Sequence, residues 1–133
     1  MTFIVTGQAG DAMSSPAGIG IRNADGTISF TVVADNGWIK EGIGEVLNRD
    51  FPTRAKAEAL ILTGPMPGRF LVLSGSLPAV AYDETDFLRK LVCFPRCMIT
   101  YAYLWTENGW TFRRIDGSDS ILLTEAIRRG IED

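Results

Sequence analysis

The chain has 133 residues, of which 46% are hydrophobic and 22% are charged, and its net charge is −3 at pH 7. This length and composition predict one folded domain spanning residues 1–133, rather than a disordered or two-domain protein. The acidic balance argues against a general nucleic-acid binder, and no apolar run approaches the roughly 18 residues of a membrane span, so we expect a cytoplasmic protein.

The first part of the chain carries little hydrophobic patterning. Residues 2–6 are predicted to form a short strand, and residues 7–18 a loop rich in Gly, Ser, Ala and Pro. We expect residues 1–12 to be a flexible or peripheral segment. Met13 is an alternative to Met1 as the start of translation.

A hairpin is predicted over residues 18–34, with its turn at Asp25-Gly26. A two-residue turn there predicts a half-buried sheet with one polar face toward water. The predicted pairs are Ile21 with Phe30 and Ile19 with Val32 on one face, and Arg22 with Ser29 and Gly20 with Thr31 on the other.

Two helices are predicted after this hairpin. The apolar stripe of the first consists of Ile39, Ile43, Val46 and Leu47. Gly42 and Gly44 weaken this helix by about 1 kcal/mol each relative to alanine, so we expect close packing against the sheet to require them. The second helix is predicted to begin after Thr53 as its N-cap and to end at Gly64.

The next elements are shorter. Residues 70–73 are predicted to form a buried strand, and residues 75–81 a loop. Asp83 is the predicted N-cap of a third helix, and Ser118 or Thr124 is expected to cap a final one. The apolar side of that final helix consists of Leu123, Ile127 and Ile131.

The strongest pattern is the aromatic and β-branched stretch of residues 99–115, interrupted by Asn108-Gly109. Asn-Gly tolerates the positive φ angles of a tight turn, so a second hairpin is predicted. A two-residue loop predicts the pairs Glu107 with Trp110, Trp105 with Phe112, and Tyr103 with Arg114. The face predicted to enter the core consists of Ile99, Tyr101, Tyr103, Trp105, Trp110 and Phe112. The opposite face is mixed, and we expect it to be partly covered.

These elements together predict an α+β fold. Its antiparallel sheet is built from the two hairpins plus the short strand at residues 70–73. Three or four helices are expected to pack against this sheet.

Few residues of the sequence suggest catalysis. The chain contains no histidine, which removes Ser-His and Cys-His catalysis and histidine-ligated zinc. Cys93 and Cys97 are interpreted as semi-buried structural thiols, because two thiolates cannot complete a tetrahedral zinc site. The acidic residues Asp83, Glu84 and Asp86 fit the start of a helix, where carboxylates are favourable. We therefore predict no catalytic residue, no metal site and no cofactor.

Two groups of residues are candidate binding sites. Trp38, with Asp35 and Glu41 nearby, lies at the bend after the first hairpin, where it is either a core residue or the wall of a ligand site. The second group comes from the two hairpins, and in it one arginine of the first hairpin could meet one of the second and bind a phosphate. These arginines are Arg22, Arg113 and Arg114.

Several segments occur together in an order that is typical of one group of proteins. They are Met-Ser-Ser at 13–15, Ile-Gly-Ile-Arg-Asn-Ala-Asp-Gly-Thr-Ile at 19–28, Gly-Trp at 37–38, Glu-Gly-Ile-Gly at 41–44, Arg-Ala-Lys-Ala-Glu-Ala-Leu-Ile at 54–61, Tyr-Ala-Tyr-Leu-Trp at 101–105 and Leu-Thr-Glu-Ala-Ile at 123–127. In this pattern the chain resembles small proteins encoded by bacteriophages and prophages. The bend of that group usually reads Cys-His-Trp-Asp-Gly-Tyr, whereas residues 34–38 here read Ala-Asp-Asn-Gly-Trp. The resemblance therefore implies a phage origin and transfers no Cys or His chemistry.

The resemblance leads to the first functional hypothesis, a phage-type accessory binding protein rather than an enzyme. Such a protein would inhibit or sequester a host component, such as a defence protein, in the host cytoplasm, and we expect it to be a homodimer. The first alternative is a protein that binds a small ligand or nucleotide through Trp38 and the arginines. The second alternative is a metal-dependent hydrolase built on Asp35, Glu41 and other carboxylates.

Overall fold

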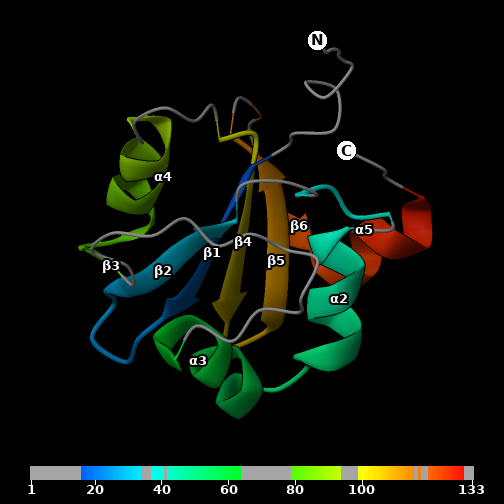
Figure 1. Cartoon of the computed structure of the whole chain (residues 1–133), viewed down its shortest axis with the longest axis horizontal. Helices are drawn as coiled ribbons and strands as arrows, with labels where there is room; N and C mark the ends of the chain where they lie inside the picture. Colours follow the sequence, from blue (N-terminus) through cyan, green and yellow to red (C-terminus); the bar gives the residue numbers. More distant parts are fainter. Residues whose placement is uncertain are drawn as a thin grey trace, which may run out of the picture.

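The computed structural model describes residues 16–33, 37–40, 42–63, 79–93, 99–115, 117 and 120–130. A six-stranded sheet forms its centre, with the strand order β3-β2-β1-β4-β5-β6 (Figure 1). The strands are β1 (Ala17–Arg22), β2 (Ile28–Val33), β3 (Ala79–Ala81), β4 (Tyr101–Thr106), β5 (Gly109–Arg114) and β6 (Ile121–Leu122). The helices of this part of the chain are α2 (Ile43–Asp50), α3 (Arg54–Thr63), α4 (Glu84–Val92) and α5 (Leu123–Arg129). The predicted α+β class, with two hairpins and packed helices, is confirmed.

The sheet is antiparallel except where the two hairpins meet. There β1 and β4 run parallel, with Ala17 beside Tyr101 and Ile21 beside Trp105. A parallel pair needs a crossover that returns the chain to the same end of the sheet. The chain between β1 and β4 contains β2, α2, α3, β3 and α4. The turn residues that predict each hairpin do not determine how the hairpins join, so the parallel pair was absent from the prediction.

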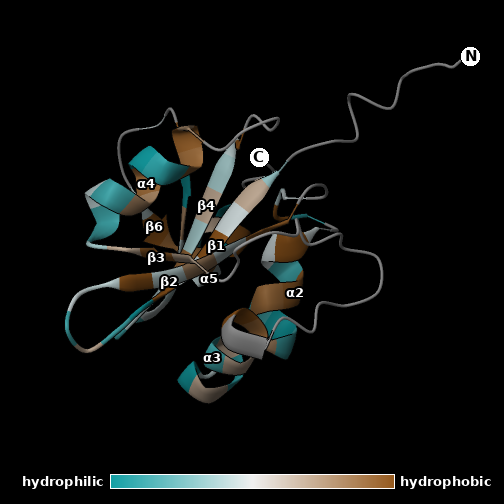
Figure 2. Cartoon of the chain, turned by 60° about the vertical axis from the view of Figure 1, so that its left-hand side comes forward, coloured by the Kyte–Doolittle hydropathy of each residue, from teal (hydrophilic) through white to brown (hydrophobic). Residues whose placement is uncertain are grey.

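Helices cover both faces of the sheet (Figure 2). On one face α2, α3 and α5 bury a large cluster that contains Ile19 and Tyr103. On the other face α4 buries a smaller cluster that contains Phe30, Phe87 and Leu91. The expected polar face of the first hairpin is therefore wrong, because both faces of β1 and β2 are buried.

The first hairpin turns through residues 23–27 instead of a two-residue turn. Gly26 has a φ of +91° and donates its N–H to the carbonyl oxygen of Asn23 at 3.0 Å. The carboxylate of Asp25 accepts hydrogen bonds from the N–H and the hydroxyl of Thr27, at 3.0 and 2.6 Å. These bonds stabilise a turn that is longer than the predicted two-residue turn.

This longer loop shifts the pairing of β1 with β2 by one residue. The observed pairs include Ile21 with Ser29, Ile19 with Thr31, Gly20 with Phe30 and Arg22 with Ile28. A one-residue shift moves side chains to the other face of a strand. The predicted pairs are therefore wrong, and the apolar residues of β1 and of β2 largely face opposite clusters.

The second hairpin keeps its predicted core face although its register differs by two residues. Thr106 lies opposite Gly109, Trp105 opposite Trp110 and Tyr103 opposite Phe112. Faces survive such a shift because side chains alternate with a period of two. The confirmed aromatic face consists of Tyr101, Tyr103, Trp105, Trp110 and Phe112.

The opposite face of this hairpin lies under α4. Ala102 and Leu104 are buried there, which confirms that the second face of this hairpin is partly covered. Ile99 precedes β4 and packs in this smaller cluster, so its predicted place on the aromatic face is wrong.

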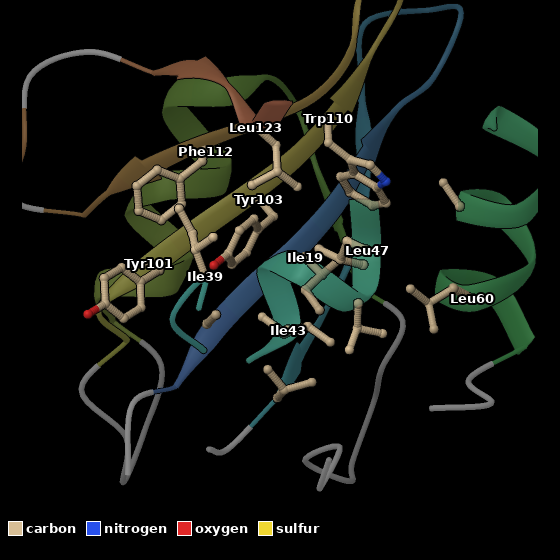
Figure 3. Close-up of a cluster of buried hydrophobic side chains, with 14 of the residues drawn as sticks. Ile19, Ile39, Ile43, Leu47, Leu60, Tyr101, Tyr103, Trp110, Phe112 and Leu123 are labelled. Atoms are coloured by element: carbon tan, nitrogen blue, oxygen red, sulfur yellow. The ribbon is translucent and has the colours of Figure 1, made fainter. Parts of the chain in front are cut away.

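Aromatic side chains of the second hairpin fix the position of α2 (Figure 3). The hydroxyl of Tyr103 donates to the carbonyl oxygen of Gly37 at 2.6 Å, and Nε1 of Trp110 donates to that of Phe51 at 2.7 Å. Gly37 precedes α2 and Phe51 is its C-cap. Both ends of this helical segment are therefore bonded to the sheet. The predicted apolar stripe, Ile39, Ile43, Val46 and Leu47, is buried between these contacts.

Two predicted helix caps are confirmed. The side chain of Asp83 caps α4, and the hydroxyl of Thr53 accepts a backbone N–H from the first turn of α3 at 3.3 Å. By contrast, α5 begins after Leu122 without a side-chain cap, and Thr124 lies inside the helix. Ser118 lies outside the described residues.

Other expectations fall outside the described residues, namely the strands at residues 2–6 and 70–73 and the segment 1–12. The predicted loop at residues 75–81 is wrong at its end, where β3 pairs with β2. Within the described ranges, each helix is too short or too polar to cross a bilayer.

Candidate functional site

The bend after the first hairpin is described only in part. Asp35 and Glu41 lie outside the described residues. Trp38 is half-buried and packs against the large cluster. This contact favours the core interpretation of Trp38 over the ligand-site interpretation.

The structure does not bring the predicted arginines together. Arg22 is the last residue of β1 and lies at the end of the sheet where both hairpins turn. Arg113 and Arg114 pair with the first residues of β4, at the opposite end of the strands. Arg113 donates to the carbonyl oxygen of Gly117 at 2.6 Å, and the guanidinium of Arg114 lies 5.9 Å from the ring centre of Tyr101. Arg113 and Arg114 therefore make structural contacts at the end of β5.

The carboxylate of Asp86 has a structural role. It is buried and accepts the N–H of Tyr82 at 2.9 Å, and both Arg89 and Lys90 contact it. The hydrogen bond from the backbone of Tyr82 and the two cations lower the pKa of Asp86 to about 2. The side chain therefore joins β3 to α4. The described residues contain no group of three or more Cys, Asp or Glu side chains that could hold a metal ion.

Cys93 is a free thiol at the C-cap of α4. It is exposed, so the expectation of a semi-buried thiol is wrong for this residue. Cys97 lies outside the described residues.

A groove of about 470 Å³ opens at the end of the sheet where β1 and β4 finish. Because these two strands are parallel neighbours, their carboxyl ends lie side by side at the same end of the sheet. We call this the arginine groove. It is lined by the loop after β1, the start of α3 and the β4–β5 turn. Its lining consists of Arg22, Asn23, Ala24, Gly26, Arg54 and Glu107.

Two arginine residues from different elements line the arginine groove. Nη2 of Arg22 lies 2.9 Å from Oε1 of Glu84, and the Arg22 side chain is 41% exposed. Nη1 of Arg54 donates to the carbonyl oxygen of Arg22 at 3.1 Å, and its Nη2 lies 3.8 Å from Glu58. Both arginines are therefore paired with carboxylates of neighbouring helices, and their side chains remain partly exposed.

A second surface follows the outer edge of the sheet at β3, which pairs only with β2 among the described strands. Val80 is 58% exposed and Tyr82, directly after the strand, is 81% exposed. The backbone of Tyr82 is held by Asp86, and Nζ of Lys90 lies 5.9 Å from the centre of its ring. We call β3 together with Tyr82 the β3 edge.

Comparison of the chain with protein-family models, with curated proteins and with solved structures finds no significant match.

Sequence reasoning missed Arg54, Glu107 and the β3 edge. One signal for Arg54 was present, because a cation at the start of a helix opposes the helix dipole. The first turn of α3 carries no acidic residue to offset that charge. Glu107 gave no signal other than its place in a turn, since its proximity to the arginines depends on the parallel pairing of β1 with β4.

Proposed function

We propose that this chain is a non-catalytic binding protein that captures a protein partner along the β3 edge. The observation that carries this proposal is the exposure of Val80 and Tyr82 at β3, an outermost strand among those that the structure describes. Large exposed apolar groups on an edge strand are a liability that folded proteins usually cover. Such an edge is also the surface to which an extended segment of another protein can add as a strand.

The side chains of this edge suit recognition. Tyrosine is enriched among the residues that dominate binding energy, because its ring offers a large contact area at low entropic cost. The backbone of Tyr82 is fixed by Asp86, so its ring is presented from a rigid position. Binding would therefore not require the edge to be ordered first.

The resemblance to phage-encoded proteins supports a host protein as the partner, and inhibition or sequestration as the outcome. The net charge of −3 suits a basic target, such as a nucleic-acid-binding host protein.

The test combines affinity capture with mapping of the bound surface. The tagged full chain is used to capture partners from host lysate, and the purified complex is analysed by hydrogen exchange. We expect protection of the amides of residues 79–82 in the complex. We also expect Val80→Lys and Tyr82→Ala to abolish capture, because a charge at the edge opposes strand addition and the alanine removes the aromatic contact.

Val92→Ala is the matched control, since Val92 is 63% exposed but lies at the far end of α4. This variant should capture the partner as the parent chain does. A partner that is retained by Tyr82→Ala, or that leaves residues 79–82 unprotected, would contradict the proposal.

A further inference from the structure

The backbone groups of β2 alternate between its two neighbours, β1 and β3. In an antiparallel pair, a residue that exchanges hydrogen bonds with its partner is followed by one whose N–H and C=O face the other way. The N–H of Asn23 donates to the carbonyl oxygen of Thr27 at 2.7 Å, in line with the register of β1 and β2. Alternation from this bonded pair turns the backbones of Ile28 and Phe30 away from β1 and toward β3.

The same alternation leaves one residue of β3 with outward backbone groups. Ala79 and Ala81 lie opposite the two β2 residues that face this strand, so their backbones bond to β2. The N–H and C=O of Val80 therefore face away from the sheet, and none of the other described residues bonds to them. The N–H of Tyr82, the next to face outward, already donates to Asp86 at 2.9 Å. Within the described part of the β3 edge, Val80 is thus the residue with both a free donor and a free acceptor.

A free donor and a free acceptor on one residue are complementary to the same residue of a second copy. When two identical strands pair antiparallel about a two-fold axis, the central residue of each can lie opposite itself and exchange both hydrogen bonds. Val80 is the middle residue of β3, so an axis at this residue would satisfy both of its outward groups. Its side chain, which is 58% exposed, would then pack against its own counterpart.

The neighbouring side chains are compatible with such a pair. Asp83 and Glu84 follow the carboxyl end of β3. Antiparallel pairing places the carboxyl ends of two copies at opposite ends of the contact, so these acidic residues would not face their own counterparts. The exposed Tyr82 lies two residues from Val80, a spacing at which an aromatic ring can reach Val80 of the second copy diagonally.

We propose that the β3 edge joins two copies of this chain through an antiparallel strand pair centred on Val80. The contact is short, so the dimer is weak and reversible and dissociates in dilute solution. The inference concerns the same edge as the proposed function but does not depend on a host partner. A second copy and a host partner would compete for this edge, so self-pairing covers the exposed side chains until a partner displaces it.

The test is analytical ultracentrifugation of the full chain over a wide range of concentration. We expect a reversible monomer–dimer equilibrium that Val80→Lys and Val80→Glu each abolish, because two like charges would lie directly opposite each other. An equimolar mixture of the two variants should dimerise about fivefold or more tighter than either variant alone, since lysine then faces glutamate. This recovery requires residue 80 to lie opposite itself, and a damaged fold cannot produce it.

Leu122→Lys is the matched control, because Leu122 is 42% exposed on β6, the outermost described strand at the other side of the sheet. This variant should dimerise as the parent chain does. A parent chain that is monomeric at every concentration, a dimer that survives Val80→Lys, a mixture that is no tighter than its components, or loss of the dimer in Leu122→Lys would overturn the proposal.

Capture from lysate tests the proposed function separately from the dimer. A chain that dimerises through residue 80 but captures no host protein would support this inference and contradict the proposed function. A monomeric chain that captures a partner along the β3 edge would do the reverse.

Discussion

Tyr103 shows how one residue connects the sheet to α2. Its hydroxyl is buried and donates to the carbonyl oxygen of Gly37 at 2.6 Å, and burial raises the pKa of Tyr103 well above its ordinary value. We expect Tyr103→Phe to lower the free energy of unfolding by about 1–3 kcal/mol, because the carbonyl group is left without this donor. Urea denaturation measures the loss. Tyr82→Phe, at an exposed ring, should be neutral, and equal stability of the two variants would contradict the structural role of the hydroxyl.

Asp86 should make stability depend on pH in the acid range. Its pKa is about 2 in the folded chain and has an ordinary value of 3.8. Because the folded pKa is the lower one, the stabilisation is fully present above the ordinary value and is lost as the pH falls toward 2. We expect the parent chain to be more stable than Asp86→Asn near neutral pH, and this difference to shrink between about pH 5 and pH 2. A difference that stays constant across urea titrations in this range would show that Asp86 is not ionised in the way the structure indicates.

The sequence predicts single residues well where one physical effect dominates. The aromatic face of residues 101–112 follows from alternation alone, and the caps Asp83 and Thr53 follow from their side-chain chemistry. Arg54 could not be placed in this way, because its neighbours in the groove come from β1 and the β4–β5 turn. Residues that act through distant partners need the topology first.

The elements themselves were predictable, whereas the registers of the hairpins were not. Both turns contain a sequence that is typical of a two-residue loop, namely Asp25-Gly26 and Asn108-Gly109. In the first, the carboxylate of Asp25 bonds to Thr27 and stabilises a longer loop. In the second, the two-residue loop is formed by residues 107–108, and Gly109 has a φ of +102° at the start of β5. The energy differences between such turns are small, so the packing of both sheet faces decides the register.

Gly44 provides a test of packing at the level of one helix. Gly42 is the N-cap of α2, so only Gly44 lies within the helix. A Cβ added to Gly44 would lie 2.7 Å from the Cα of Ile39 and 3.0 Å from the hydroxyl of Tyr103. The close packing that was expected at this glycine therefore occurs, against the preceding backbone and the sheet.

Helix propensity and packing predict opposite effects for Gly44→Ala. Propensity alone predicts a gain of about 1 kcal/mol, whereas the contact with a backbone atom forces a shift that costs about 1–3 kcal/mol. We expect net destabilisation in thermal or urea unfolding. Asn48→Ala, in the same helix, should be neutral or slightly stabilising. Higher stability of Gly44→Ala would show that the segment before α2 yields easily.

For the molecule as a whole, the order of the strands was beyond sequence reasoning. Alternation predicted one polar face for the first hairpin, but the shifted register divides these residues between the two faces, and helices cover both faces of the sheet (Figure 2). The strand order also determines where the groove lies, because the parallel pairing of β1 with β4 brings their carboxyl ends together at the arginine groove. Neither this groove nor the β3 edge could be recognised before the sheet was assembled.

This strand order also predicts how stability is distributed across the molecule. β1 lies between β2 and β4 and is buried on both faces, whereas β3 and β6 are the outermost described strands and are only a few residues long. Amides of β1 and β4 should exchange with solvent only through global unfolding, while those of β3 and β6 should exchange through local opening. Native-state hydrogen exchange of the free chain measures both. Protection of β3 equal to that of β1 would mean that the β3 edge is already covered, and would remove the basis for partner binding there.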